Sequence, residues 1–195
     1  MARQIGILGG SFNPVHIGHL MLASYLSQYT SLDEVWLTFS PQNPLKNADM
    51  LIGDKHRIEM LRIASENVAG VEVCDAELNL PRPSYTIDTL TYLQERYPEY
   101  KFRLIIGADN WTIFNKWKEY ERIIAEFGVI VYLRPGYELS EISVANVEVV
   151  EAPTINISST FIREGFSLKK DMSVFLPHGV CRYILDNNLY QNNNI

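Results

Sequence analysis

Short apolar runs and helical stripes of apolar residues follow one another along the whole chain. The runs predict strands at 5–8, 35–39, 71–73, 102–106, 129–133 and, more weakly, 147–150. Apolar residues three and four positions apart predict helices over about 17–25, 54–68, 87–97, 120–127, 159–165 and 179–188. Residues 41–53 contain two prolines, two asparagines and a glycine, which is typical of a loop.

This alternation predicts an α/β fold. Strands that are continuous apolar runs belong to a parallel sheet covered by helices on both faces, so we expect a Rossmann-like doubly wound sheet. The 195 residues predict a single domain, 1–195, with a polar tail at about 191–195. In such sheets ligands bind outside the carboxyl ends of the strands, so unusual residues directly after strands become candidates for a site.

Composition narrows the function classes. The charge is 17 − 23 = −6, which disfavours nucleic acid and anionic membranes as partners. No apolar run reaches the roughly 18 residues of a membrane-spanning helix, and no signal peptide is expected. Cys74 and Cys181 are too few for a disulfide framework and fit small buried residues in a reducing cytoplasm, so we expect a cytoplasmic protein.

The first candidate site is the segment 9–20, GGSFNPVHIGHL. We expect the pair Gly9-Gly10 to end the first strand in a sharp turn whose N–H groups can face an anion. His16 and His19 share one face of the first helical turn, and Gly18 between them leaves room for a ligand. The helix N-terminus adds partial positive charge. Walker and dinucleotide-binding motifs are absent here, and zinc stays an alternative that lacks a third ligand in this segment.

The second candidate site is the segment 157–163, ISSTFIR, at the start of a predicted helix. Its hydroxyl residues are natural helix caps, and capping alone is one reading. Together with Arg163 one turn later, they can also form an anion clamp of N–H groups, hydroxyls, helix dipole and guanidinium.

Both segments resemble the signatures of one superfamily of nucleotidyltransferases. The pattern G-x-F-x-P-x-H-x-G-H, over residues 10–19, is similar to its phosphate-binding histidine motif, and I-S-S-T-x-I-R is similar to its triphosphate-binding segment. The middle of the chain resembles the bacterial nicotinate mononucleotide adenylyltransferases within it, through S-Y-T-x-D-T-L at 84–90, G-x-D-x(7)-W at 107–117 and Arg134-Pro135-Gly136. The resemblance covers about residues 5–190.

Two positions depart from the family pattern. The loop after the second strand reads Pro44-Leu45-Lys46 where the family often has Pro-His-Lys, and Asn13 stands where Asp is common. The missing loop histidine leaves the phosphate contacts of that loop open, although Lys46 can still supply a positive charge.

The resemblance implies the joining of ATP and nicotinate mononucleotide to give nicotinate adenine dinucleotide and pyrophosphate, in the biosynthesis of NAD. It implies Mg²⁺ held mainly by substrate phosphates, with no protein metal ligands, and it leaves a homo-oligomer possible. His19 would stabilise the α-phosphoryl group, and His16 would hold the phosphate chain. The further residues implied in ATP and phosphate binding are Gly9, Gly10, Ser11, Phe12, Lys46, Ile157, Ser158, Ser159 and Arg163.

The resemblance also implies an acceptor site. Asp109 would contact a nucleotide ribose, Trp117 would stack on the pyridine ring, and N–H groups near Thr86 would bind its carboxylate. The other residues implied in nucleotide binding are Ser84, Tyr85, Gly107 and Arg134. Trp117 as a core aromatic, and Asp109 or Ser84 as a helix cap, are the structural alternatives.

Other functions share parts of this pattern. Phosphopantetheine adenylyltransferases and cytidylyltransferases carry the same histidine motif, and nicotinamide mononucleotide is a second pyridine acceptor. A class I aminoacyl-tRNA synthetase fragment is disfavoured by the acidic charge, the short chain and the lack of a K-M-S-K-S-like loop. A non-catalytic nucleotide sensor would not need both histidines and Arg163.

Overall fold

Six parallel strands form one sheet in the order β3-β2-β1-β4-β5-β6. The structure is a computed structural model, and it describes residues 2–42, 51–134, 136–137 and 144–191. The strands are β1 (Gln4–Gly10), β2 (Glu34–Phe39), β3 (Val71–Cys74), β4 (Lys101–Gly107), β5 (Val129–Tyr132) and β6 (Val147–Val150). In register, Gly10 of β1 lies beside Phe39 of β2, and Leu8 lies beside Ile105 of β4.

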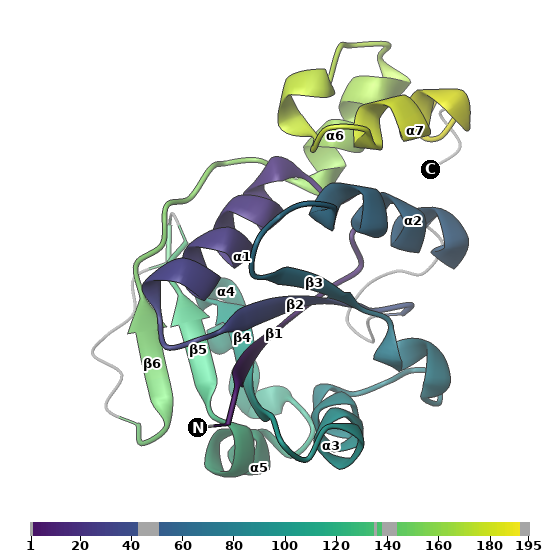
Figure 1. The fold of residues 1–195 in the computed structure, drawn as a ribbon. Coiled ribbons are helices and arrows are strands. Elements are labelled where there is room, and N and C mark those ends of the chain that lie inside the picture. The colour runs from purple at the N-terminus through teal and green to yellow at the C-terminus, as the bar shows by residue number, and fades with distance from the viewer. Residues whose placement is uncertain (1, 43–50, 135, 138–143, 192–195) are drawn as a thin grey trace.

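Helices cover both faces of the sheet (Figure 1). The α-helices are α1 (Ile17–Tyr29), α2 (Asp54–Ser65), α3 (Thr86–Arg96), α4 (Ala108–Trp111), α5 (Tyr120–Arg122), α6 (Ser159–Ser167) and α7 (Val180–Asp186). Shorter turns are η2 (Ala76–Asn79), η3 (Phe114–Lys116), η4 (Ile123–Phe127) and η5 (Ser173–Phe175). Helices α1 and α2 lie on one face and α3 and α5 on the other, and α6 and α7 lie together above α1 and α2 in Figure 1.

The strands divide the core into two layers because alternate side chains point to opposite faces. Leu8 packs with the α1, α2, α6 and α7 side, whereas Ile5 and Ile7 pack with α3. The same alternation separates Ile105 from its neighbours on β4. Gly6 faces the α1 layer, where an added Cβ would come within 2.5 Å of Ile105 Cδ1. Both layers are therefore built on runs that the sequence shows as continuously apolar.

The strand order places a switch point between β1 and β4. From β1 the chain winds outward to β2 and β3, and it then returns to build β4, β5 and β6 on the other side. Where the winding reverses, the loops after the two adjacent strands separate and leave a crevice at the carboxyl edge. The turn that leads to His16 and His19 follows β1, and Ala108 and Asp109 follow β4.

The structure confirms the α/β fold and each predicted strand, and it corrects two local expectations. Gly9 and Gly10 do not form the turn after β1; they are the last two residues of the strand and still pair with β2. The stripe 120–127 is not one regular α-helix, because a single α turn at Tyr120–Arg122 continues as a π-helix at Ile123–Phe127. Within the described ranges, no helix has the length and apolar character needed to cross a membrane.

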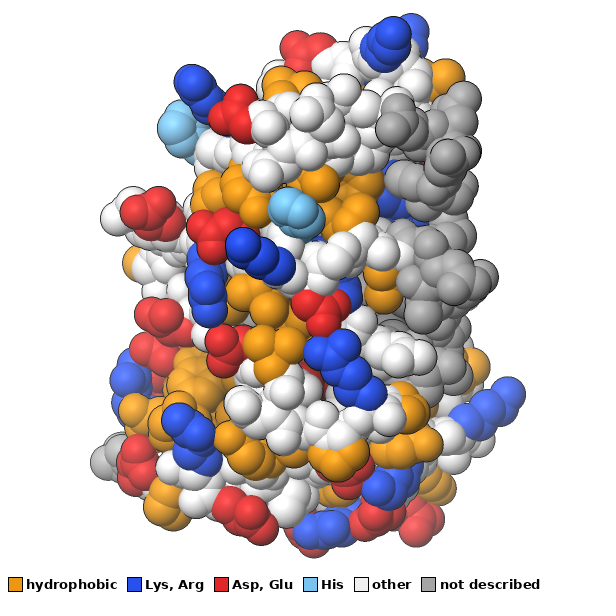
Figure 2. All heavy atoms as spheres, turned by 90° about the vertical axis from the view of Figure 1, so that its right-hand side faces the viewer, with side chains coloured by type: hydrophobic (Ala, Val, Ile, Leu, Met, Phe, Trp, Pro, Cys, Tyr) orange, Lys and Arg blue, Asp and Glu red, His pale blue; other side chains and the backbone are white. Residues whose placement is uncertain are grey.

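Charged side chains of both signs are mixed on the face at the right of Figure 1 (Figure 2). Apolar side chains lie between them in short bands. The acidic excess of the chain is thus not gathered into one patch on this face.

Candidate active site

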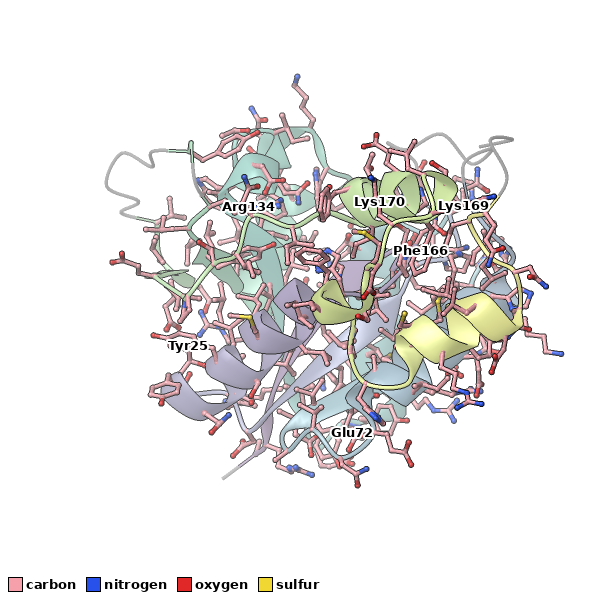
Figure 3. All side chains as sticks on the ribbon, turned by 90° about the horizontal axis from the view of Figure 1, so that it is seen from above. Tyr25, Glu72, Arg134, Phe166, Lys169 and Lys170 are labelled. Atoms are coloured by element: carbon pink, nitrogen blue, oxygen red, sulfur yellow. The ribbon has the colours of Figure 1, made fainter. Side chains whose placement is uncertain are left out.

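A cavity of about 630 Å³, here called the first cavity, lies at the carboxyl edge of the sheet. Its lining comes mainly from residues 11–22, from 132–137 with Asp109, and from 153–163. Seen from above, Arg134 and Phe166 of α6 lie in the upper half of the picture, and Tyr25 of α1 lies in the lower half (Figure 3). The fold therefore brings together the two histidines and Arg163, which are about 145 residues apart in the chain.

The turn between β1 and α1 has an unusual backbone. Phe12 has a φ of 44°, in the left-handed region that residues other than glycine rarely adopt. Its buried ring packs edge to face on His19, with ring centroids 5.1 Å apart. Gly10 makes room for this ring, since an added Cβ would lie 2.9 Å from Phe12 Cζ. Phe12 thus fixes the position of the His19 ring by packing against it. Ser11, the residue before Phe12, lines the first cavity.

His16 and His19 stack on each other at the start of α1, with ring centroids 3.7 Å apart. The backbone N–H of His16 donates to Nδ1 of His19 at 3.1 Å. His16 is buried, and its Nδ1 has no hydrogen-bond partner among the described residues. Burial, with a smaller effect of the positive charge of Arg134, lowers the pKa of His16 from 6.5 to about 4. At neutral pH His16 is therefore an uncharged ring.

Gly18 leaves room for protein atoms as well as for a ligand. An added Cβ at this position would lie 3.1 Å from Nδ1 of His16 and 3.2 Å from Cγ2 of Ile155. Gly18 also lines the first cavity. Gly18 therefore also allows His16 and Ile155 to pack closely, a role that the sequence analysis did not predict.

The start of α6 is joined directly to the turn after β1. Ser159 Oγ donates to the carbonyl of Pro14 at 2.8 Å, and Arg163 donates to the carbonyl of Asn13 at 2.9 Å. Ser158 is the N-cap of α6, where its hydroxyl accepts from the N–H of Phe161 at 3.1 Å. Of the hydroxyls of the predicted clamp, that of Ser159 therefore joins α6 to the turn after β1, and that of Ser158 caps α6. The buried Ile157, Ser158, Ser159 and Arg163 all still line the first cavity.

Asp109 and Arg134 form an ion pair across the ends of β4 and β5, with 2.7 Å between Asp109 Oδ2 and Arg134 Nη1. The other oxygen, Oδ1, is buried and has no partner among the described residues. Gly107 allows this arrangement, because an added Cβ would come within 2.8 Å of Arg134 Cδ. Both charged side chains line the first cavity, and Oδ1 of Asp109 is an acceptor without a donor among the described residues.

A second cavity of about 250 Å³ lies on the other side of the switch point. Tyr132 lines both cavities, so the two adjoin there. Trp117 packs on Phe114, with ring centroids 5.2 Å apart, and its buried Nε1 has no partner among the described residues. The predicted residues that line the second cavity are Gly9, Gly10, Ser84, Tyr85, Thr86, Gly107 and Trp117. Gly9 and Gly10, which the sequence associated with phosphate, thus face this second cavity.

Glu77 is a buried acid in the second cavity that the sequence analysis missed. Ser84 Oγ donates to its Oε2 at 2.6 Å, and Thr89 Oγ1 donates to its Oε1 at 3.1 Å. Burial raises the pKa of Glu77, and hydrogen bonds from Ser84, Ser40 and Thr89 oppose that rise. Ser84 is therefore not the cap of α3; the N-cap is Tyr85. No periodicity marks Glu77, because it lies in the short turn η2.

Arg57 is a second residue that the sequence analysis missed. This α2 side chain is only 1% exposed, and its guanidinium donates to four backbone carbonyls and to Asp54. One of the carbonyls is that of Ser11, at 2.9 Å. The others belong to Ser40, Pro41 and Ile52, at 3.1, 2.8 and 3.0 Å. Arg57 thus fixes the turn after β1 to both ends of the loop after β2.

Two predicted features concern metal and loop contacts. Within the described parts of the chain, no group of three or more His, Cys, Asp or Glu residues could hold a metal ion. Lys46, with Pro44 and Leu45, lies outside the described residues, as does Pro135. The phosphate contacts of that loop therefore stay a prediction.

Comparison with known proteins agrees with this geometry. Residues 7–165 match the cytidylyltransferase-like family. Proteins named "Probable nicotinate-nucleotide adenylyltransferase" from Bacteroides fragilis and Bacteroides thetaiotaomicron are 48% and 49% identical to this chain, over 93% of it and 91% and 90% of their own lengths. The structure of Plasmodium falciparum nicotinic acid mononucleotide adenylyltransferase complexed with NaAD is 23% identical, covers 98% of each chain with a TM-score of 0.80, and confirms the fold. The chain belongs to the cytidylyltransferase-like family and, within it, to the nicotinate-nucleotide adenylyltransferases.

Proposed function

We propose that this protein transfers the adenylyl group of ATP to the 5′-phosphate of nicotinate mononucleotide and releases pyrophosphate. The observation that carries the proposal is the pair of adjoining cavities at the switch point. One is lined by His16, His19 and Arg163, and the other by Trp117 and the N-terminus of α3. A polyphosphate fits the first set of groups, and an aromatic ring with an anionic substituent fits the second.

The reaction needs positioning more than acid–base chemistry. The acceptor phosphate is already an anion, so it attacks the α-phosphorus of ATP without a general base. A new oxygen–phosphorus bond forms as the bond to the bridging α–β oxygen breaks, and pyrophosphate leaves with that electron pair. Negative charge builds up on the α-phosphoryl oxygens and on the leaving group, and groups aimed at those atoms lower the barrier.

In this proposal, His19 donates a hydrogen bond to the α-phosphoryl group. Because its Nδ1 accepts the backbone N–H of His16, the proton of a neutral His19 ring lies on Nε2. Stacking on His16 and the edge of Phe12 fix the orientation of this ring. The direction of the Nε2–H bond of His19 is therefore fixed before substrate binds.

His16 contributes differently from a cation. With a pKa of about 4 it is neutral under physiological conditions, so it contacts phosphate through hydrogen bonding and shape. The His16 side chain lines the first cavity, whereas its Nδ1 is buried and has no partner among the described residues. The positive charge for the phosphates comes instead from Arg163, from the exposed part of Arg134 and from the N-terminus of α6.

Mg²⁺ enters as part of the substrate in this proposal. Mg²⁺ prefers phosphate oxygens and water to a cage of protein ligands. The described residues that line the first cavity include one carboxylate, Asp109, and it is paired with Arg134. We therefore assign no protein ligand to the metal.

The second cavity supplies the acceptor site. Helix geometry leaves the N–H groups of Thr86 and Ile87 without acceptors inside α3, and Thr86 lines the cavity. A carboxylate at that helix N-terminus is stabilised by these donors and by the helix dipole. Trp117 and Tyr85 provide flat apolar surface for the ring.

The test is a pyrophosphate-release assay with ATP and Mg²⁺. Nicotinate mononucleotide, nicotinamide mononucleotide and phosphopantetheine are run in parallel as acceptors. We expect the highest kcat/KM with nicotinate mononucleotide. Release with phosphopantetheine alone would overturn the acceptor, and no release with any acceptor would favour a nucleotide sensor.

A further inference from the structure

The buried carboxylate of Glu77 lies directly behind the N-terminus of α3. It accepts from Ser84, which precedes the N-cap, and from Thr89, one turn into the helix. These two bonds join the first turn of α3 to η2, the turn after β3. All three side chains line the second cavity.

The other side of the same helical turn is joined to the segment that follows η3. Lys118 Nζ contacts both carboxylate oxygens of Asp88, at 2.9 and 3.1 Å, and lies 4.8 Å from the ring centroid of Tyr85. These groups are half exposed, so their bonds are weak. The two bonds at Glu77 are buried, and the one to Ser84 is short. The orientation of the first turn therefore depends mainly on Glu77.

This orientation matters because the donors of the turn are backbone N–H groups. Asp88 and Thr89 already donate their N–H groups to the carbonyl of Tyr85. The N–H groups of Thr86 and Ile87 are the ones that helix geometry leaves for a ligand. Backbone donors cannot adjust by changing a rotamer, so their aim is set by whatever holds the turn.

We propose that Glu77 is a positioning residue of the acceptor site, which holds the first turn of α3 through Ser84 and Thr89 so that its N–H groups face the anionic group of the acceptor. The inference rests on the proposed function, in which a pyridine carboxylate binds at this turn. Glu77 itself does not touch the reacting atoms.

Steady-state kinetics of Glu77→Ala and Glu77→Gln test the proposal. We expect Glu77→Ala to raise KM for nicotinate mononucleotide about tenfold, because the buried hydrogen bonds from Ser84 and Thr89 are lost, while KM for ATP changes less than about twofold. Glu77→Gln keeps the size of the side chain, and its amide can accept from one hydroxyl and donate to the other. We therefore expect it to restore KM for the acceptor to within about threefold of wild type.

The matched control is Glu72→Ala. Glu72 lies exposed on β3, lines neither of the two cavities, and its replacement changes the net charge equally. Equal rises in both KM values for Glu77→Ala, an unchanged KM for the acceptor, or a Glu77→Gln variant as impaired as Glu77→Ala would each overturn the proposal. Should Glu77→Ala fail to fold, Thr89→Val removes one of the two bonds from the other side, and a smaller rise in the acceptor KM is expected, with KM for ATP again unchanged.

Amide hydrogen exchange separates this inference from the proposed function, because it needs no substrate. We expect Glu77→Ala to speed exchange at Asp88 and Thr89 while exchange in α2 stays as in wild type. Failure of the wild-type enzyme to use nicotinate mononucleotide would refute the activity without changing this result. Unchanged exchange in the first turn of α3 would refute the role of Glu77 even in an active enzyme.

Discussion

Acid should destabilise this protein through one histidine. The pKa of His16 is about 4 in the folded protein because the ring is buried, whereas an unfolded chain has the ordinary value near 6.5. Between these two pH values the histidine is protonated in the unfolded chain but neutral in the native state. The free energy of unfolding therefore decreases as the pH falls below 6.5. The loss amounts to about 2 kcal/mol between pH 7.5 and pH 5, and it levels off below about pH 4.

Urea unfolding at pH 7.5 and pH 5 measures this loss. Wild type is compared with His16→Gln, which keeps a polar side chain but cannot titrate, and with His178→Gln, which changes an exposed histidine. The free energy of unfolding should fall by about 2 kcal/mol less in His16→Gln than in wild type over this range, whereas His178→Gln should follow wild type. Parallel pH dependences for wild type and His16→Gln would show that His16 is not held neutral by burial.

Three further substitutions separate chemistry, positioning and stability. His19→Ala should lower kcat by about 100-fold with a modest effect on ATP affinity, and a wild-type rate of chemistry in rapid-quench experiments would contradict its role. Arg57→Met should cost about 3 kcal/mol or more of unfolding free energy, because the carbonyls that accept from Arg57 are left buried without a donor. The control Arg62→Met changes an exposed arginine and should cost under about 0.5 kcal/mol. Equal losses in urea unfolding would refute this prediction. Asp109→Ala should raise KM for ATP about tenfold. The free energy of unfolding should change by less than about 1 kcal/mol, since the ion pair of Asp109 with Arg134 is half exposed. A large fall in melting temperature with an unchanged KM would instead assign Asp109 a structural role.

The sequence predicted the elements well because each one has a strong local signal. The strands are apolar runs, the helices have apolar stripes, and two of the motifs follow strand ends. The segment 120–127 shows the limit of this approach. Its stripe predicts a helix of period 3.6, but the chain forms a π-helix that ends at Gly128, whose φ is 78°, and the apolar stripe does not distinguish the two helix types.

Buried polar residues were harder to predict, since their partners are distant in sequence. Arg57 occupies the apolar stripe of α2, four residues before Leu61, and a charged residue on such a stripe is a usable signal. Glu77 has no such signal, because its partners Ser84 and Thr89 lie across a turn that only the fold creates. The same holds for Tyr190, which lies next to the polar tail but is only 4% exposed.

The turn between β1 and α1 explains why the two motifs occur together. Its left-handed Phe12 costs about 1–3 kcal/mol and persists only because the surroundings hold it. Four hydrogen bonds from distant parts of the chain hold it: Arg57 to the Ser11 carbonyl, Arg163 to the Asn13 carbonyl, Tyr190 to Asn13 Oδ1 and Ser159 to the Pro14 carbonyl. Two of the donors belong to the second motif itself. That motif therefore serves the site twice, by lining the first cavity and by holding the backbone that aims His19.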